Sequence, residues 1–66
     1  MHPAKQRLQE EIDQVDGRLN KLCDFIDSNS FYLGLDEVQK HLLRIQRSVM
    51  KSYLDVLQLR FITFED

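Results

Sequence analysis

The sequence predicts an all-α protein, a single antiparallel hairpin of two long helices that assembles into a homodimeric four-helix bundle. Three observations lead to this prediction. Residues 4–27 carry one narrow line of apolar side chains at helical spacing, residues 36–62 carry two such lines, and the short segment between them begins with residues that favour turns. We treat residues 1–66 as one domain, because a chain of this length can enclose only one small core.

The first helix is expected over residues 4–27, where apolar residues recur at alternating intervals of four and three. This heptad spacing has a period of about 3.5 residues and gives a helix a single apolar edge. Away from this edge nearly every residue is charged or carries an amide, so we expect the other faces to be exposed. Gly17 lies opposite the edge. The edge is formed by Leu8, Ile12, Val15, Leu19, Leu22 and Ile26.

The connection is expected to be a loop over residues 28–35. Its first three residues are polar and compete for backbone hydrogen bonds, which stops the first helix. The next five are largely apolar. We expect Phe31 and Leu35 to cover the end of the hairpin, and Tyr32 and Leu33 to remain partly exposed.

The second helix is expected over residues 36–62, beginning at Asp36 and Gln39, which have the spacing of a capping box. It carries two apolar stripes that together cover about half of its circumference, whereas a helix packed on one neighbour needs only about 100°. One stripe can face the first helix, and the other must be covered from outside. The first stripe is Val38, Leu42, Ile45, Val49, Tyr53 and Val56; the second is Leu43, Met50, Leu54, Leu57, Phe61 and Phe64.

We expect the second stripe to be the face on which two copies of the chain meet about a two-fold axis. Gln46 lies within it and, if buried there, would need a hydrogen-bond partner that could fix the register of the two copies. The expected self-association residues are Leu43, Gln46, Met50, Leu54, Leu57 and Phe61.

Several classes of function find no support in the sequence. No apolar run approaches the ~20 residues of a membrane span, and the first residues lack the apolar core of a signal peptide. Cys23 is the only cysteine, which fits a reducing cytoplasm. No nucleophile with a base and no metal-ligand spacing is present. We therefore expect a soluble cytoplasmic protein that is not an enzyme and needs no metal or cofactor.

One charged pattern on the second helix has a defined geometry. Lys40, Arg44, Arg47 and Lys51 are spaced by four, three and four residues, which places them within a sector of about 60°. We call these four residues the basic ridge. It could be an anion site for a nucleic-acid backbone, a nucleotide or an acidic protein surface. The simpler alternative is a solvated face paired with acids of the first helix, which is favoured because no aromatic residues interleave with the charges.

Two further positions are candidate contacts for a partner. Tyr32 lies in the apolar connection, and Phe64 continues the apolar phase at the end of the second helix. Together with Phe61, Phe64 could either cover the open end of the hairpin or anchor a partner, because aromatic side chains dominate interface hot spots. The sequence leaves these two alternatives open.

From Leu22 onward, a Leu-x-x-Phe-Ile segment, a polar turn and a Glu-x-Gln-x-x-Leu-Leu segment follow one another, with further residues at helical spacing. The residues concerned are Leu22, Phe25, Ile26, Phe31, Leu35, Glu37, Gln39, Leu42, Leu43, Gln46, Met50, Tyr53, Leu57 and Arg60. This pattern resembles a family of short phage and prophage proteins related to a protein of a crAss-like gut phage. Val38 departs from it, since a Glu is more usual there.

The resemblance implies a phage-encoded accessory protein that acts inside an infected bacterium. Our leading hypothesis is that it binds, and so modulates or inhibits, a host factor or an anti-phage defence factor. A second hypothesis is that the basic ridge binds nucleic acid or a nucleotide signal. A third is that the chain is a structural assembly protein.

Overall fold

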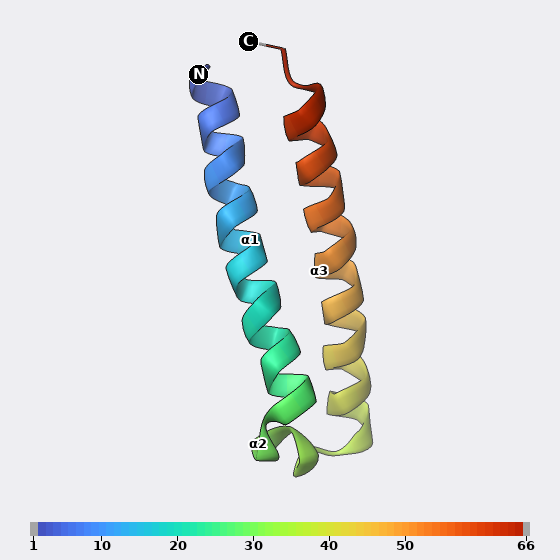
Figure 1. Ribbon diagram of the computed structural model, residues 1–66. Helices are drawn as coiled ribbons and strands as arrows, with labels where there is room; N and C mark the ends of the chain where they lie inside the picture. Colours follow the sequence, from blue (N-terminus) through green and yellow to red (C-terminus); the bar gives the residue numbers. More distant parts are fainter. Residues whose placement is uncertain (1, 66) are drawn as a thin grey trace.

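A computed structural model of the chain describes residues 2–65 and shows a helical hairpin (Figure 1). Helix α1 spans Pro3–Ser28, α2 is a single turn at Ser30–Leu33, and α3 spans Glu37–Thr63. The two long helices lie side by side and antiparallel, which brings the two ends of the chain to the same end of a rod 48 Å long. The predicted antiparallel hairpin of two long helices is confirmed.

Both long helices begin at a capping side chain. The His2 ring accepts a hydrogen bond from the Ala4 amide at 3.0 Å, and Pro3 occupies the first position, where a missing N–H costs nothing. At the start of α3, the Asp36 carboxylate accepts a hydrogen bond from the Gln39 amide at 2.8 Å. Asp36 therefore caps α3 as its spacing to Gln39 predicted.

The connection is more ordered than the expected loop, because Asn29 both ends α1 and starts α2. Its extended backbone interrupts the helix, and its side chain accepts a hydrogen bond from the Phe31 amide at 2.8 Å. The turn that follows determines which residues point inward. Tyr32 is buried, with 7% of its surface exposed, while Phe31 is 79% exposed. The expectation that Phe31 covers the hairpin and that Tyr32 is partly exposed is therefore wrong.

The core runs along the contact between α1 and α3. The apolar edge of α1 is confirmed, since four of its residues are buried, and Leu57 of α3 is completely buried between the helices. Four partly buried side chains pack against this core. The buried core residues are Leu8, Ile12, Val15, Leu19, Leu54 and Leu57, and the partly buried ones are Cys23, Met50, Phe61 and Phe64.

The two stripes of α3 have exchanged the places expected for them: the second stripe faces α1 and the first stripe faces outward. Leu54 and Leu57, which were predicted to meet a second copy, are buried against α1, and Met50 and Phe61 pack beside them. Leu43 is half-buried, and the whole first stripe is 45–66% exposed. The prediction that the second stripe faces outward is wrong, because this stripe supplies the partner surface for α1.

Gly17 lies on the exposed face in the middle of α1, where a Cβ atom would meet nothing within 4 Å. Glycine in a helix interior is less favourable than alanine by about 1 kcal/mol because of its backbone freedom. We expect Gly17→Ala to raise the free energy of unfolding by about 1 kcal/mol. Thermal unfolding followed by circular dichroism measures this. A melting temperature that stays equal or falls would mean that the glycine is needed for a contact outside the single chain.

Candidate functional site: the basic ridge and the closed end of the hairpin

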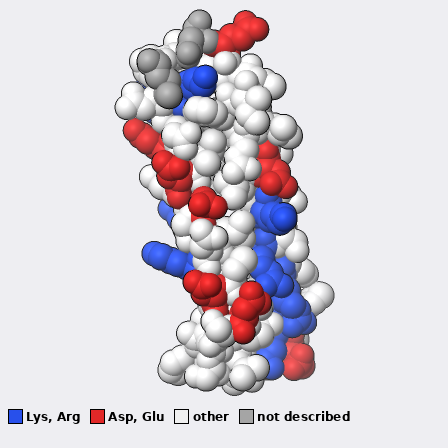
Figure 2. Space-filling model, viewed as in Figure 1, with Lys and Arg blue, Asp and Glu red and all other residues white. Residues whose placement is uncertain are grey.

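The basic ridge lies along the half of α3 nearest to α2. Figure 2 shows basic side chains in a column over this part of α3 and acidic side chains over α1 beside it. Packing the second stripe against α1 is what sets this arrangement, because the ridge borders that stripe on the helical wheel. The ridge therefore runs close to the groove between the two long helices.

Two residues of the ridge are paired with carboxylates. The Arg47 guanidinium lies 3.3 Å from the Asp27 carboxylate at the end of α1. The Lys40 ammonium lies 3.5 Å from Glu37, one turn earlier on α3, and only 17% of the Lys40 side chain is exposed. Arg47 is thus paired with an acid of α1. This is what the alternative of a solvated ridge, paired with acids of the first helix, predicts.

Arg44 and Lys51 are different, because neither is paired with a carboxylate among the residues that the structure describes. Arg44 instead donates a hydrogen bond to the Tyr32 hydroxyl at 2.8 Å, and Lys51 is exposed. These two cations are seven residues apart, which is about 10 Å along the helix axis. The ridge therefore carries positive charge at Arg44 and Lys51, on either side of Arg47, that the hairpin does not neutralise.

The buried Tyr32 side chain contacts Lys40 and Arg44, at the end of the ridge nearest to α2. Its ring meets the Phe25 ring edge-on, with centroids 6.0 Å apart, and the Lys40 ammonium lies 5.8 Å from its centroid. The hydroxyl accepts from Arg44 and still has a proton to donate. Tyr32 was predicted to contact a partner directly, but its buried ring makes it a support for Arg44.

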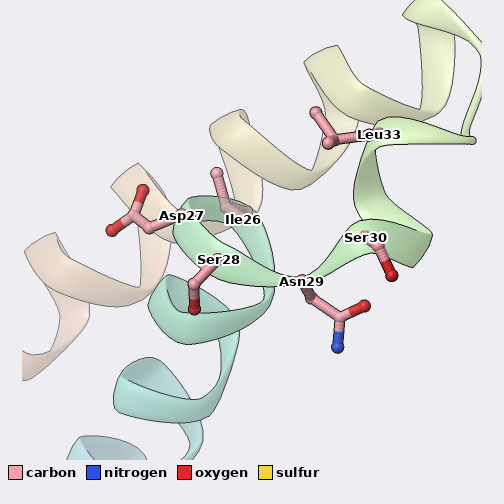
Figure 3. Close-up of a pocket in the computed structure, with 6 residues that line it drawn as sticks. All are labelled: Ile26, Asp27, Ser28, Asn29, Ser30 and Leu33. Atoms are coloured by element: carbon pink, nitrogen blue, oxygen red, sulfur yellow. The ribbon is translucent and has the colours of Figure 1, made fainter.

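Beside α2 the surface forms a hollow of about 280 Å³. Figure 3 shows Ile26 of α1 and Leu33 of α2 among the residues that line it. Three of its polar side chains already have partners, since Asp27 pairs with Arg47, the Ser28 hydroxyl donates to the Asp24 carbonyl and the Asn29 side chain caps α2. The hollow offers a small polar ligand little to bind, but Leu33 is 72% exposed and could contact a protein.

The two C-terminal phenylalanines close the open end of the hairpin. The Lys5 ammonium lies 4.8 Å from the centroid of the Phe61 ring, and the His2 and Phe64 rings lie 5.7 Å apart. Both phenylalanines are partly buried against the core. Of the two alternatives left open by the sequence, packing against the start of α1 is the one found, so Phe64 is not a free anchor.

Two other polar residues on α3 are explained by the hairpin. Gln46 was expected to be buried in an interface, but it is exposed and contacts the Met50 sulfur at 3.9 Å. The Tyr53 hydroxyl donates a hydrogen bond to the Glu11 carboxylate, which raises the pKa of Tyr53 above its usual value. This bond ties the first stripe of α3 to the flank of α1.

The part of the chain that the structure describes has no cluster of metal ligands and no helix suited to cross a membrane. Among residues 2–65, no three His, Cys, Asp or Glu side chains lie close enough together to hold a metal ion. In the same range no helix is long and apolar enough to cross a membrane.

A family model of the Sequestin family matches residues 2–62, which include both long helices and the ridge. The chain belongs to the Sequestin family. No curated protein and no solved structure matches it. The Sequestin match covers the whole hairpin, so the ridge, the closed end and the first stripe all lie within the family's domain. The name points to the binding of a partner.

Proposed function

We propose that this Sequestin protein is a non-enzymatic accessory protein of a phage or prophage that binds and withholds a factor of the host or of an anti-phage defence system. The family name supports a binding role, and the hairpin carries a charged ridge on which a partner could be held. Binding without chemical change needs only complementary charge and shape.

The factor that fits the ridge best is a small nucleotide signal that bears one or two phosphates. The observation that carries this proposal is the pair of cations, Arg44 and Lys51, that no carboxylate of the described residues neutralises. Arginine and lysine both bind phosphate, and the Arg44 guanidinium is already oriented by Tyr32. The separation of about 10 Å between the two residues is within reach of one nucleotide with its phosphates.

A long nucleic acid fits the ridge less well. Duplex DNA carries one negative charge per ~1.7 Å of its axis and would extend well beyond the three turns of the ridge. It would then meet the acidic side chains that lie over α1 (Figure 2). The formal net charge of −2 opposes such binding further.

Charge reversal on the ridge tests the proposal. We expect wild-type protein to bind at least one member of a panel of AMP, ADP and cyclic dinucleotides in isothermal titration calorimetry. The double substitution Arg44→Glu and Lys51→Glu should weaken that binding more than 100-fold, since it removes about 3 kcal/mol or more of charge-assisted contacts.

The matched control reverses Arg7 and Lys21 instead, two exposed cations of α1 that lie outside the ridge. This control makes the same change in net charge and should bind the nucleotide as wild type does. Equal loss in both double variants would mean that total charge, and not the ridge, governs binding. If wild-type protein binds no nucleotide of the panel, the nucleotide proposal fails.

A protein factor is the second candidate, and a different surface favours it. Phe31 and Leu33 project from α2 with 79% and 72% of their surfaces exposed, beside the hollow at the closed end. Exposed apolar side chains beside a hollow are typical of a protein contact. In this case Phe31→Ala would abolish capture of the host protein, whereas Ile62→Ala, equally exposed on α3, would not.

We also propose that the chain acts as an oligomer of hairpins. A core of six buried residues is small, and α3 leaves a long apolar stripe exposed. Both features favour association of copies.

A further inference from the structure

The outward face of α3 is apolar along most of the helix. Of the large apolar residues of the chain that are exposed, eight lie on α3. The first stripe accounts for six of these, and Leu59 continues it, so that the stripe runs about 32 Å from Val38. Single exposed apolar residues are ordinary on a protein surface, but a continuous line of this length indicates an interface.

The same face carries no formal charge. Five charged residues occur between Val38 and Leu59, and all of them fall within about 80° of the helical wheel, on the side away from the first stripe. On α3 itself the stripe is flanked only by neutral side chains, and the charge that borders it from α1 is the Glu11 carboxylate, which the Tyr53 hydroxyl already hydrogen-bonds. A solvated face would hold several charges in a chain of which 30% is charged. The flanking residues are Gln39, His41, Gln46, Ser48 and Ser52.

We propose that a second copy of this chain covers this face, with the two α3 helices packed antiparallel about a two-fold axis near Val49. A neutral apolar face is complementary to itself, because pairing two of them opposes no like charges. The copy also supplies a helix of matching length and period, which a stripe of about 32 Å requires. This inference refines the self-association part of the proposed function and is independent of the ligand.

The antiparallel orientation follows from the one charge at the end of the stripe. An axis at Val49 places Arg60 of one copy opposite Val38 of the other, next to the acidic first turn at Asp36 and Glu37. Parallel packing would instead place Arg60 beside Arg60 of the second copy. Antiparallel packing therefore avoids the repulsion between two Arg60 side chains. It places each Arg60 next to the acidic first turn of the other copy, which attracts it, at both ends of the interface.

This arrangement is compatible with a four-helix bundle. The centres of the two stripes of α3 lie about 105° apart on the wheel, close to the ~90° between neighbours in a square bundle. The two α3 helices would pack on each other, and each would keep its own α1 on the neighbouring face. The basic ridge lies away from the paired face, so each copy keeps its own ridge open and one dimer holds two equivalent sites.

Sedimentation equilibrium of the full chain tests the interface. Wild-type protein should have twice the mass of the chain at high concentration, and Val49→Glu should reduce it to the mass of one chain while helicity is retained. Val49 is 62% exposed in the single hairpin, so this substitution leaves the core intact. The control Gln58→Glu adds the same charge outside the neutral face and should leave the dimer unchanged. A wild-type monomer, or a Val49→Glu dimer, overturns the inference.

Disulfide trapping tests the register, in a chain whose single cysteine is replaced by Cys23→Ala. A cysteine on a two-fold axis meets its own copy, so Val49→Cys should form a linked dimer rapidly on mild oxidation. Leu42→Cys alone should not form a linked dimer, because Leu42 faces Val56 of the second copy. The double variant Leu42→Cys with Val56→Cys should form one. Ready linkage through Leu42→Cys alone would mean parallel packing and would overturn the proposed register.

Discussion

Leu57→Ala is expected to destabilise the hairpin more than truncation of any other leucine to alanine. Among residues 2–65, Leu57 is the one side chain with no exposed surface, and it lies between the two long helices among five other buried residues. Truncation of a buried leucine costs about 2–5 kcal/mol, because the transfer energy is lost and the cavity closes only in part. A single core in a chain of this size rarely supplies more than about 3–5 kcal/mol.

We therefore expect Leu57→Ala to be largely unfolded at room temperature when it is dilute. Urea unfolding followed by circular dichroism, at one fixed protein concentration, measures the change. Ile62→Ala is the control, since Ile62 is 76% exposed on the same helix and its truncation should change the free energy of unfolding by no more than ~0.5 kcal/mol. Similar midpoints for the two variants would contradict the inward orientation of the second stripe.

The second large effect is expected at Tyr32. Tyr32→Ala removes the ring on which α2, Phe25 and Arg44 converge, and loss of a buried aromatic side chain costs about 3–5 kcal/mol. Tyr32→Phe keeps the ring and removes only the acceptor for Arg44, at a cost of about 1 kcal/mol. Both variants should weaken ligand binding at the ridge, because each leaves the Arg44 guanidinium without its orienting contact.

The comparison of the two variants separates folding from function. Tyr32→Phe should melt close to wild type and still bind the nucleotide more weakly, whereas Tyr32→Ala should lose both stability and binding. If Tyr32→Phe binds as wild type does, Tyr32 has a packing role alone, and Arg44 needs no support to act.

The two long helices of this fold follow from local sequence patterns. The heptad spacing of α1 identifies its buried edge, because one narrow apolar line can face only one way, and Asp36 marks the start of α3 through its distance to Gln39. In each case a local pattern determines a local structure without reference to the rest of the chain.

The orientation of α3 could not be obtained in this way, because its two stripes are about equally apolar. The charge pattern held a signal that resolves the choice. The basic ridge borders the second stripe, so packing that stripe on α1 brings Arg47 to Asp27, whereas packing the first stripe would turn the ridge away from the acids of α1. Electrostatic matching between the helices indicates the inward face where hydrophobicity does not.

The site was harder to predict than the fold. The spacing of the ridge was evident, but which of its cations remain unpaired depends on the partner helix and on the turn at α2. Tyr32 illustrates the difficulty. In a run of apolar loop residues, sequence order does not show which one turns inward, and here the Asn29 cap sets the phase of the turn.

We propose that the chain holds a phosphate-bearing nucleotide on its ridge without altering it. Native mass spectrometry of the protein purified from phage-infected bacteria with an active defence system tests this most directly. We predict a bound small molecule, up to one per chain, that is released on denaturation with the mass of an intact nucleotide. Two results would contradict this proposal: protein purified from the infected bacteria without a bound small molecule, or a nucleotide recovered only in cleaved form.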